Sequence, residues 1–122
     1  MDRYLWVAFG SATGGIARFW LTQMGLAWWG ASFPWGTLVI NLLGSALIGV
    51  FAGMDGALSA QWKLLLMTGV CGGFTTFSSF SLQSLELIER GDVASAMGYV
   101  VASVGLCLLG CWIGYAGVTN HL

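Results

Sequence analysis

The chain has 122 residues, of which 57% are hydrophobic and only 7% are charged, and its formal net charge is -1 at pH 7. Soluble domains carry roughly 25% charged residues, so these few charges cannot form the polar surface that a chain with seven Trp and seven Phe would need in water. The lack of a basic cluster excludes a nucleic-acid-binding protein, and the mean hydropathy of +0.83 excludes a disordered chain. We therefore predict an all-α integral membrane protein embedded in a lipid bilayer.

Charged residues divide the chain into four long apolar stretches. They stand at Asp2, Arg3, Arg18, Asp55, Lys63, Glu86, Glu89, Arg90 and Asp92. Each stretch has about 20 residues or more, the length at which a helix crosses the hydrocarbon core. The sequence predicts four transmembrane helices, at about 4–28, 36–54, 61–89 and 94–118, in a single domain that spans residues 1–122.

The first predicted helix follows a weakly charged start and lacks a small-residue cleavage site, so we expect it to remain in the mature protein. Gly10, Gly14 and Arg18 are spaced by four and share one face, where small residues let another helix approach closely. Arg18 lies well inside the span, so it must snorkel, pair or face a polar cavity. A structural role and an anion-attracting role are both open.

One face of the second predicted helix carries small and polar residues at intervals of four. They are Thr37, Asn41, Ser45, Gly49 and Gly53. Such a face contacts protein rather than lipid. The primary amide of Asn41 needs partners for two donors and an acceptor, or hydration from a pore. Asn41 is therefore either an interhelical hydrogen-bonding group or part of a polar pathway.

The third predicted helix contains a segment, residues 69–81, whose low helix propensity disfavours a continuous helix. It reads Gly-Val-Cys-Gly-Gly-Phe-Thr-Thr-Phe-Ser-Ser-Phe-Ser. We predict a break, which a bilayer tolerates only where protein buries the backbone or water reaches it. The freed carbonyl oxygens suit a hard cation such as an alkali ion. A glycine kink relieved by Ser and Thr hydroxyls is the structural alternative.

Three phenylalanines in the same segment, Phe74, Phe77 and Phe80, are spaced by three residues. The edges of phenyl rings carry the positive part of the ring quadrupole, so rings presented edge-on can favour an anion. A Phe stripe at helical spacing also arises from simple packing, and spacing alone does not separate the two.

The fourth predicted helix carries a polar stripe and a small-residue seam. Tyr99, Ser103 and Cys107 stand at i, i+4 and i+8, which suits either interhelical hydrogen bonding or the lining of a polar pathway. Gly110 and Gly114 offer close helix packing.

The remaining reactive residues indicate no catalytic chemistry. Cys71, Cys107 and Cys111 are an odd number inside predicted spans, so they give no disulfide framework and are expected to pack as small apolar residues. The sole histidine, His121, is near the C-terminus, and we assign it no ligand role. Without a nucleophile and base constellation, we do not expect an enzyme.

Basic residues are almost balanced between the two sides of the predicted bundle. Arg3 and Lys63 fall on one side and Arg90 on the other. Because Lys/Arg asymmetry in short loops sets orientation, so weak a bias predicts insertion in both directions. Two oppositely inserted copies can pair as an antiparallel homodimer with a two-fold axis in the membrane plane.

Four motifs, in order along nearly the whole chain, resemble the small bacterial fluoride channels called Fluc or CrcB. They are Gly14-Gly15-Ile16-Ala17-Arg18-Phe19, Trp35-Gly36-Thr37-Leu38 with Asn41, Gly72-Gly73-Phe74-Thr75-Thr76-Phe77-Ser78-Ser79-Phe80, and the Tyr99/Ser103 stripe. The third motif is highly specific. The resemblance implies a dual-topology antiparallel homodimer in the bacterial inner membrane, whose two pores export toxic fluoride passively.

The resemblance also implies roles for individual residues. A structural, non-transported sodium ion would be held at the dimer centre by backbone carbonyls of Gly72 and Thr75 from both subunits. Arg18 matches an arginine at the pore vestibule, and Cys107 stands where a hydroxyl often continues the stripe. The implied fluoride pore residues are Asn41, Phe77, Phe80, Ser79, Tyr99 and Ser103.

Two other functions share the size and hydropathy of the chain. A four-helix, dual-topology, proton-coupled exporter of small organic cations would need an acid inside its first helix, and residues 4–28 contain none. A non-transporting assembly scaffold would explain the glycine seams but not Asn41, the helix break or the polar stripe.

Overall fold

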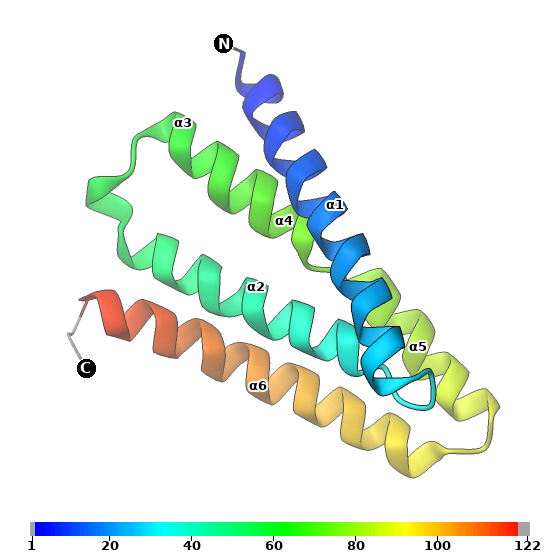
Figure 1. The fold of residues 1–122 in the computed structure, drawn as a ribbon. Coiled ribbons are helices and arrows are strands. Elements are labelled where there is room, and N and C mark those ends of the chain that lie inside the picture. Colours follow the sequence, from blue (N-terminus) through cyan, green and yellow to red (C-terminus); the bar gives the residue numbers. More distant parts are fainter. Residues whose placement is uncertain (1, 120–122) are drawn as a thin grey trace.

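The computed structural model describes residues 2–119, and every element within this range is a helix (Figure 1). The elements in chain order are α1 (Arg3–Trp29), α2 (Trp35–Gly53), the short 3-10 helix η1 (Asp55–Ala57), α3 (Ala60–Lys63), the π-helical η2 (Leu64–Cys71), α4 (Gly72–Phe74), α5 (Phe77–Glu89) and α6 (Val93–Thr119). All four predicted stretches are therefore confirmed as helical, with ends within one or two residues of the prediction. His121 lies outside the described residues.

Within residues 2–119, three helical segments are long and apolar enough to cross a membrane: α2, the run from Ala60 to Glu89, and α6. In each segment, no more than 28% of an 18-residue apolar stretch is buried within the chain. Most of this apolar surface must be covered by lipid or by another chain. The 27-residue helix α1 is long enough to span, but it is not among the three.

Two tight helix pairs organise the molecule. Figure 1 shows α1 beside α4 and α2 beside α6, and η2 also packs against α1. In the first pair, a Cβ added at Gly14 would collide with the Val70 carbonyl, and in the second a Cβ at Gly49 would collide with the Cys111 carbonyl. The predicted small-residue seams are confirmed, because at these positions only glycine allows the two backbones to approach so closely.

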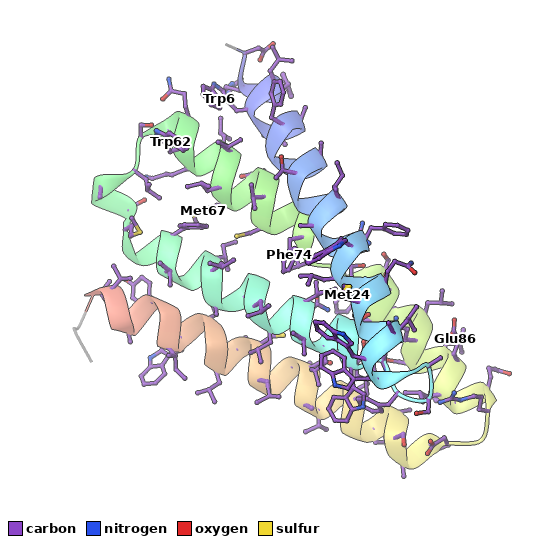
Figure 2. All side chains as sticks on the ribbon, in the orientation of Figure 1. Trp6, Met24, Trp62, Met67, Phe74 and Glu86 are labelled. Carbon is purple, nitrogen blue, oxygen red and sulfur yellow. The ribbon has the colours of Figure 1, made fainter. Side chains whose placement is uncertain are left out.

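The ends of the molecule differ in their side chains. Figure 2 shows Trp6 and Trp62 toward one end and Met24 and Glu86 toward the other. At the first end, Lys63 forms an ion pair with Asp55. At the second end, α5 ends at Glu89, and Gly91 two residues later has a φ of 81°, in the left-handed region that favours glycine.

A compact apolar cluster lies where α2, α5 and α6 meet. Its buried members are Leu38, Phe80, Leu87, Ala96 and Tyr99. Phe33, from the connection between α1 and α2, packs against this cluster and meets the Tyr99 ring edge-on at 5.4 Å between centroids. The cluster fixes the position of α5, and hence of the segment that precedes it.

Candidate functional site

The predicted break in the third stretch is confirmed, and it falls at Thr75 and Thr76. Both residues have extended backbones, with φ and ψ of -83° and 156° at Thr75 and -149° and 109° at Thr76. The Thr75 amide and hydroxyl both donate to the Cys71 carbonyl, at 3.1 and 3.0 Å. The chain thus ends one helix with its own hydrogen bonds and restarts as α5 two residues later.

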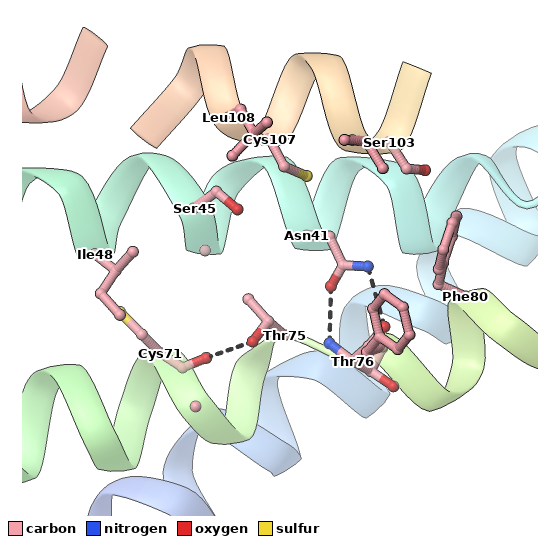
Figure 3. A pocket seen from close by; sticks show the side chains of 14 residues that line it. Asn41, Ser45, Ile48, Cys71, Thr75, Thr76, Phe80, Ser103, Cys107 and Leu108 are labelled. Atoms are coloured by element: carbon pink, nitrogen blue, oxygen red, sulfur yellow. Dashed lines mark hydrogen bonds between the residues drawn. The ribbon is translucent and has the colours of Figure 1, made fainter. Parts of the chain in front are cut away.

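Asn41 of α2 joins the break from the other side of the site. Its Nδ2 donates to the Thr76 carbonyl at 3.1 Å, and the Thr76 N–H donates to its Oδ1 at 2.8 Å (Figure 3). One side chain therefore satisfies both backbone groups of Thr76, which an interrupted helix would otherwise leave unpaired. This contact uses one of the two Nδ2 hydrogens, so the amide keeps a second donor.

Arg18 reaches the same break from α1. Its Nε donates to the Gly73 carbonyl at 3.2 Å, and its side chain is half-buried. No carboxylate within residues 2–119 forms an ion pair with this guanidinium. Arg18 therefore combines a structural hydrogen bond with a positive charge that has no acidic neighbour, so both roles left open by the sequence remain compatible with its position.

The break also releases carbonyl oxygens. In a continuous helix each carbonyl accepts from the N–H four residues later. The Thr76 N–H, which would serve Gly72, donates to Asn41 instead, and the Ser79 N–H, which would serve Thr75, donates to the Thr76 hydroxyl at 3.1 Å. In the described part of the chain, no hydrogen bond ends on the carbonyl oxygen of Gly72 or of Thr75.

A cavity of about 360 Å³ lies between the break, α2 and α6 (Figure 3). Apolar groups make up most of its wall, and a few polar groups interrupt it. Its hydrogen-bonding and thiol side chains are Asn41, Ser45, Cys71, Thr75, Thr76, Ser103 and Cys107. Ser103 is 6% exposed, and its Oγ is buried without a hydrogen-bond partner among the described residues. A buried hydroxyl of this kind calls for a ligand or water.

Two phenyl rings complete the cavity wall on α5. Phe77 and Phe80 lie 5.3 Å apart between centroids, and both line the cavity. They differ in burial, because Phe80 is buried at 8% exposure whereas Phe77 is 77% exposed. Phe77 therefore presents a nearly free ring in the single chain, and Phe80 is held by the core.

Tyr99 lies behind Phe80 and not on the cavity surface. It is 0% exposed, its ring is 5.1 Å from that of Phe80, and its hydroxyl donates to Gln83 Oε1 at 2.9 Å. Sequence reasoning missed Gln83. The available signal was a polar residue one turn after Phe80 in a span, which is costly in lipid unless it has a partner.

The structure thus brings most of the predicted site residues to one cavity. Those that line it are Asn41, Gly72, Thr75, Phe77, Phe80 and Ser103. Three predicted residues do not line it: Tyr99 lies behind Phe80, Arg18 lies at the Gly73 side of the break, and Ser79 is half-buried on α5 with its N–H bound to Thr76. Among residues 2–119, no group of three His, Cys, Asp or Glu side chains could hold a metal ion.

Long apolar helices with little internal burial, one of them broken at mid-length and held there by an amide and a guanidinium, are features of a small helical membrane protein. The family described as CrcB-like protein, Camphor Resistance (CrcB), matches residues 5–115, and the chain belongs to this family. This confirms the family that the four sequence motifs indicated.

Individual relatives match over nearly the full chain. A protein of Methylocella silvestris is 49% identical over 117 residues, covering 92% of this chain and 89% of the relative. Proteins of Paramagnetospirillum magneticum and Rhodospirillum rubrum are each 50% identical, over 124 and 119 residues, covering 98% and 93% of this chain and 97% and 92% of the relatives. All three relatives are named "Fluoride-specific ion channel FluC".

Proposed function

We propose that this chain is a fluoride-selective channel that lets fluoride leave the cell passively, and that it is not an enzyme. The observation that carries the proposal is the 49–50% identity, over 92–98% of this chain, to three proteins named as fluoride-specific channels. The cavity beside the break supports it, because four of the six residues expected in the fluoride pore lie on its wall, together with the two expected sodium ligands.

Fluoride is small and strongly hydrated, so a pore must replace its water with well-placed donors. The second N–H of Asn41 and the unpaired hydroxyl of Ser103 are two such donors on the cavity wall. The positive edges of Phe77 and Phe80 add weak attraction without competing hydration. We place the fluoride route along these groups, with Tyr99 and Ser79 as flanking positions and Arg18 at the vestibule.

The assembly we propose is an antiparallel dual-topology homodimer of four-span subunits in the bacterial inner membrane, with α1 as the fourth span. The near balance of Arg3 and Lys63 against Arg90 supports insertion in both directions. The exposed ring of Phe77 and the low internal burial of the spanning helices support a second copy at this face. A two-fold axis would give two equivalent pores.

The sodium ion implied by the family resemblance fits the residues at the break. Alkali ions are coordinated by oxygen atoms. The carbonyl oxygens of Gly72 and Thr75 are such ligands, and they accept no hydrogen bond in the described chain. We propose that these two carbonyls, with their counterparts in the second subunit, would hold it. The bound cation would supply fixed positive charge, which lowers the cost of an anion in a low-dielectric site.

Efflux from liposomes tests the proposed function. Purified protein is reconstituted into vesicles loaded with potassium fluoride, and external fluoride is followed with an electrode after a potassium ionophore is added. We expect rapid fluoride efflux without a proton gradient. Matched vesicles loaded with potassium chloride should show no chloride efflux when external chloride is followed in the same way. Efflux that requires a proton gradient, or that carries organic cations instead, would favour the exporter and contradict the proposal.

A further inference from the structure

A second cavity lies at the end of the molecule where the connection between α1 and α2 meets the last turns of α5. Its volume is about 160 Å³, and its polar lining includes Thr37, Gln83, Glu86 and Arg90. In Figure 1 the start of α2 and the end of α1 lie beside α5 at this end. This cavity has no lining residue in common with the first.

One helical turn of α5 and one side chain of α6 separate the two cavities. Phe80 lines the first cavity and packs on Tyr99, with ring centroids 5.1 Å apart. The Tyr99 hydroxyl donates to Gln83 Oε1 at 2.9 Å, and Gln83 lines the second cavity. Phe80, Tyr99 and Gln83 therefore form a chain of contacts that leads from the first cavity to the second.

Arg90 lines the second cavity. Its Nη2 donates to the Ser32 carbonyl at 2.6 Å, which ties the end of α5 to the connection between α1 and α2. Within residues 2–119, Arg90 forms no ion pair, whereas Lys63 at the other end is paired with Asp55. The guanidinium is thus held in place by a neutral carbonyl.

We infer that the second cavity is the far mouth of the anion pathway and that Arg90 concentrates anions there. This inference rests on the proposed channel function. Glu86 lines the same cavity and carries the opposing charge, but no hydrogen bond to a described residue fixes its exposed side chain. A fixed positive charge at the rim of a low-dielectric cleft raises the local anion concentration, and salt weakens the effect.

The test compares initial fluoride efflux at about 10 mM and about 1 M ionic strength, where the Debye length falls from about 30 to about 3 Å. The added salt carries an impermeant anion. At low ionic strength, Arg90→Gln should lower the efflux rate about threefold to tenfold relative to the wild-type protein. At high ionic strength, the two rates should be the same. Arg90→Lys should restore most of the rate, and Glu86→Gln should raise it.

Lys63→Gln is the matched control, because it also removes one positive charge but lies away from both cavities. It should leave the rate unchanged. Equal losses in Arg90→Gln and Lys63→Gln would show a general charge effect and overturn the inference. Equal, salt-independent losses of efflux in Arg90→Gln and Arg90→Lys would show that Arg90 has only a structural role, and would also overturn the inference. Wild-type efflux rates in both variants would overturn it as well. Absence of fluoride efflux through the wild-type protein would instead contradict the proposed function. Failure of the inference about Arg90 and failure of the proposed function are therefore distinguishable.

Discussion

Substitutions at Asn41 separate a pore role from a structural role, because the two roles predict opposite orders of damage. Asn41→Ala removes both hydrogen bonds to Thr76, and leaving a buried polar group unpaired costs about 1–3 kcal/mol. Asn41→Asp keeps an acceptor for the Thr76 N–H and loses only the donor to the Thr76 carbonyl. The folded state should therefore suffer less from Asp than from Ala.

Fluoride flux should follow the opposite order, with a larger loss in Asn41→Asp than in Asn41→Ala. A carboxylate about 4 Å from the permeating anion, at an effective dielectric constant of about 20, raises its energy by about 4 kcal/mol. Each 1.4 kcal/mol or so is tenfold in rate, so Asn41→Asp should lower flux by about 10³-fold. Asn41→Ala loses one donor to the anion and should lower it by about tenfold.

The assay pairs thermal unfolding in detergent with fluoride efflux for both variants. Ser45→Ala is a useful reference, because Ser45 lines the same cavity on the next turn of α2 and no hydrogen bond of its side chain is seen in the described structure. Flux losses that simply follow the loss of stability, or an Asn41→Asp variant that conducts like wild type, would refute the placement of Asn41 beside the anion.

Four further outcomes are expected. Phe77→Ile should cut fluoride efflux with little change in unfolding temperature, since this ring is 77% exposed in the single chain, whereas Phe9→Ile on the exposed face of α1 should leave efflux unchanged. Ser103→Ala should lower efflux about tenfold yet keep stability, because its hydroxyl has no partner within the described residues; unchanged efflux would remove it from the route. Gly14→Ala should destabilise by about 3 kcal/mol or more through its collision with Val70, and Gly15→Ala, with open space around it, by less than about 1 kcal/mol, as read by denaturant unfolding. Replacing sodium by a large organic cation should lower the unfolding temperature of the dimer, since a ligand at 100 times its Kd contributes about 2.7 kcal/mol; insensitivity to sodium would contradict the carbonyl site.

Local sequence patterns predicted the parts of the fold that depend on local physics. Helix ends followed from charges and turn residues, and the seams followed from glycines at intervals of four, such as Gly10 and Gly14. The break followed from paired glycines and threonines, which hold a helix poorly. The sequence did not distinguish Thr75 and Thr76 from the rest of residues 69–81, because many of these residues share the same low helix propensity.

The partners of the break could not be predicted, because they come from distant parts of the chain. Asn41 is 35 residues from Thr76, and Arg18 is 55 residues from Gly73. No helical periodicity relates such positions, so only tertiary packing shows that the amide and the guanidinium both donate to carbonyls at the break. The burial of Tyr99 behind Phe80 has the same cause, since a stripe at i and i+4 defines a face but not its depth.

Fluoride itself should carry current through this protein. Purified protein in a planar bilayer, with a tenfold fluoride gradient and equal chloride on both sides, measures this directly. The proposal predicts a current that reverses within a few millivolts of the fluoride equilibrium potential, about 59 mV for a tenfold gradient of a monovalent ion. Reversal near zero, where chloride is balanced, or a folded protein that passes no current, would contradict it.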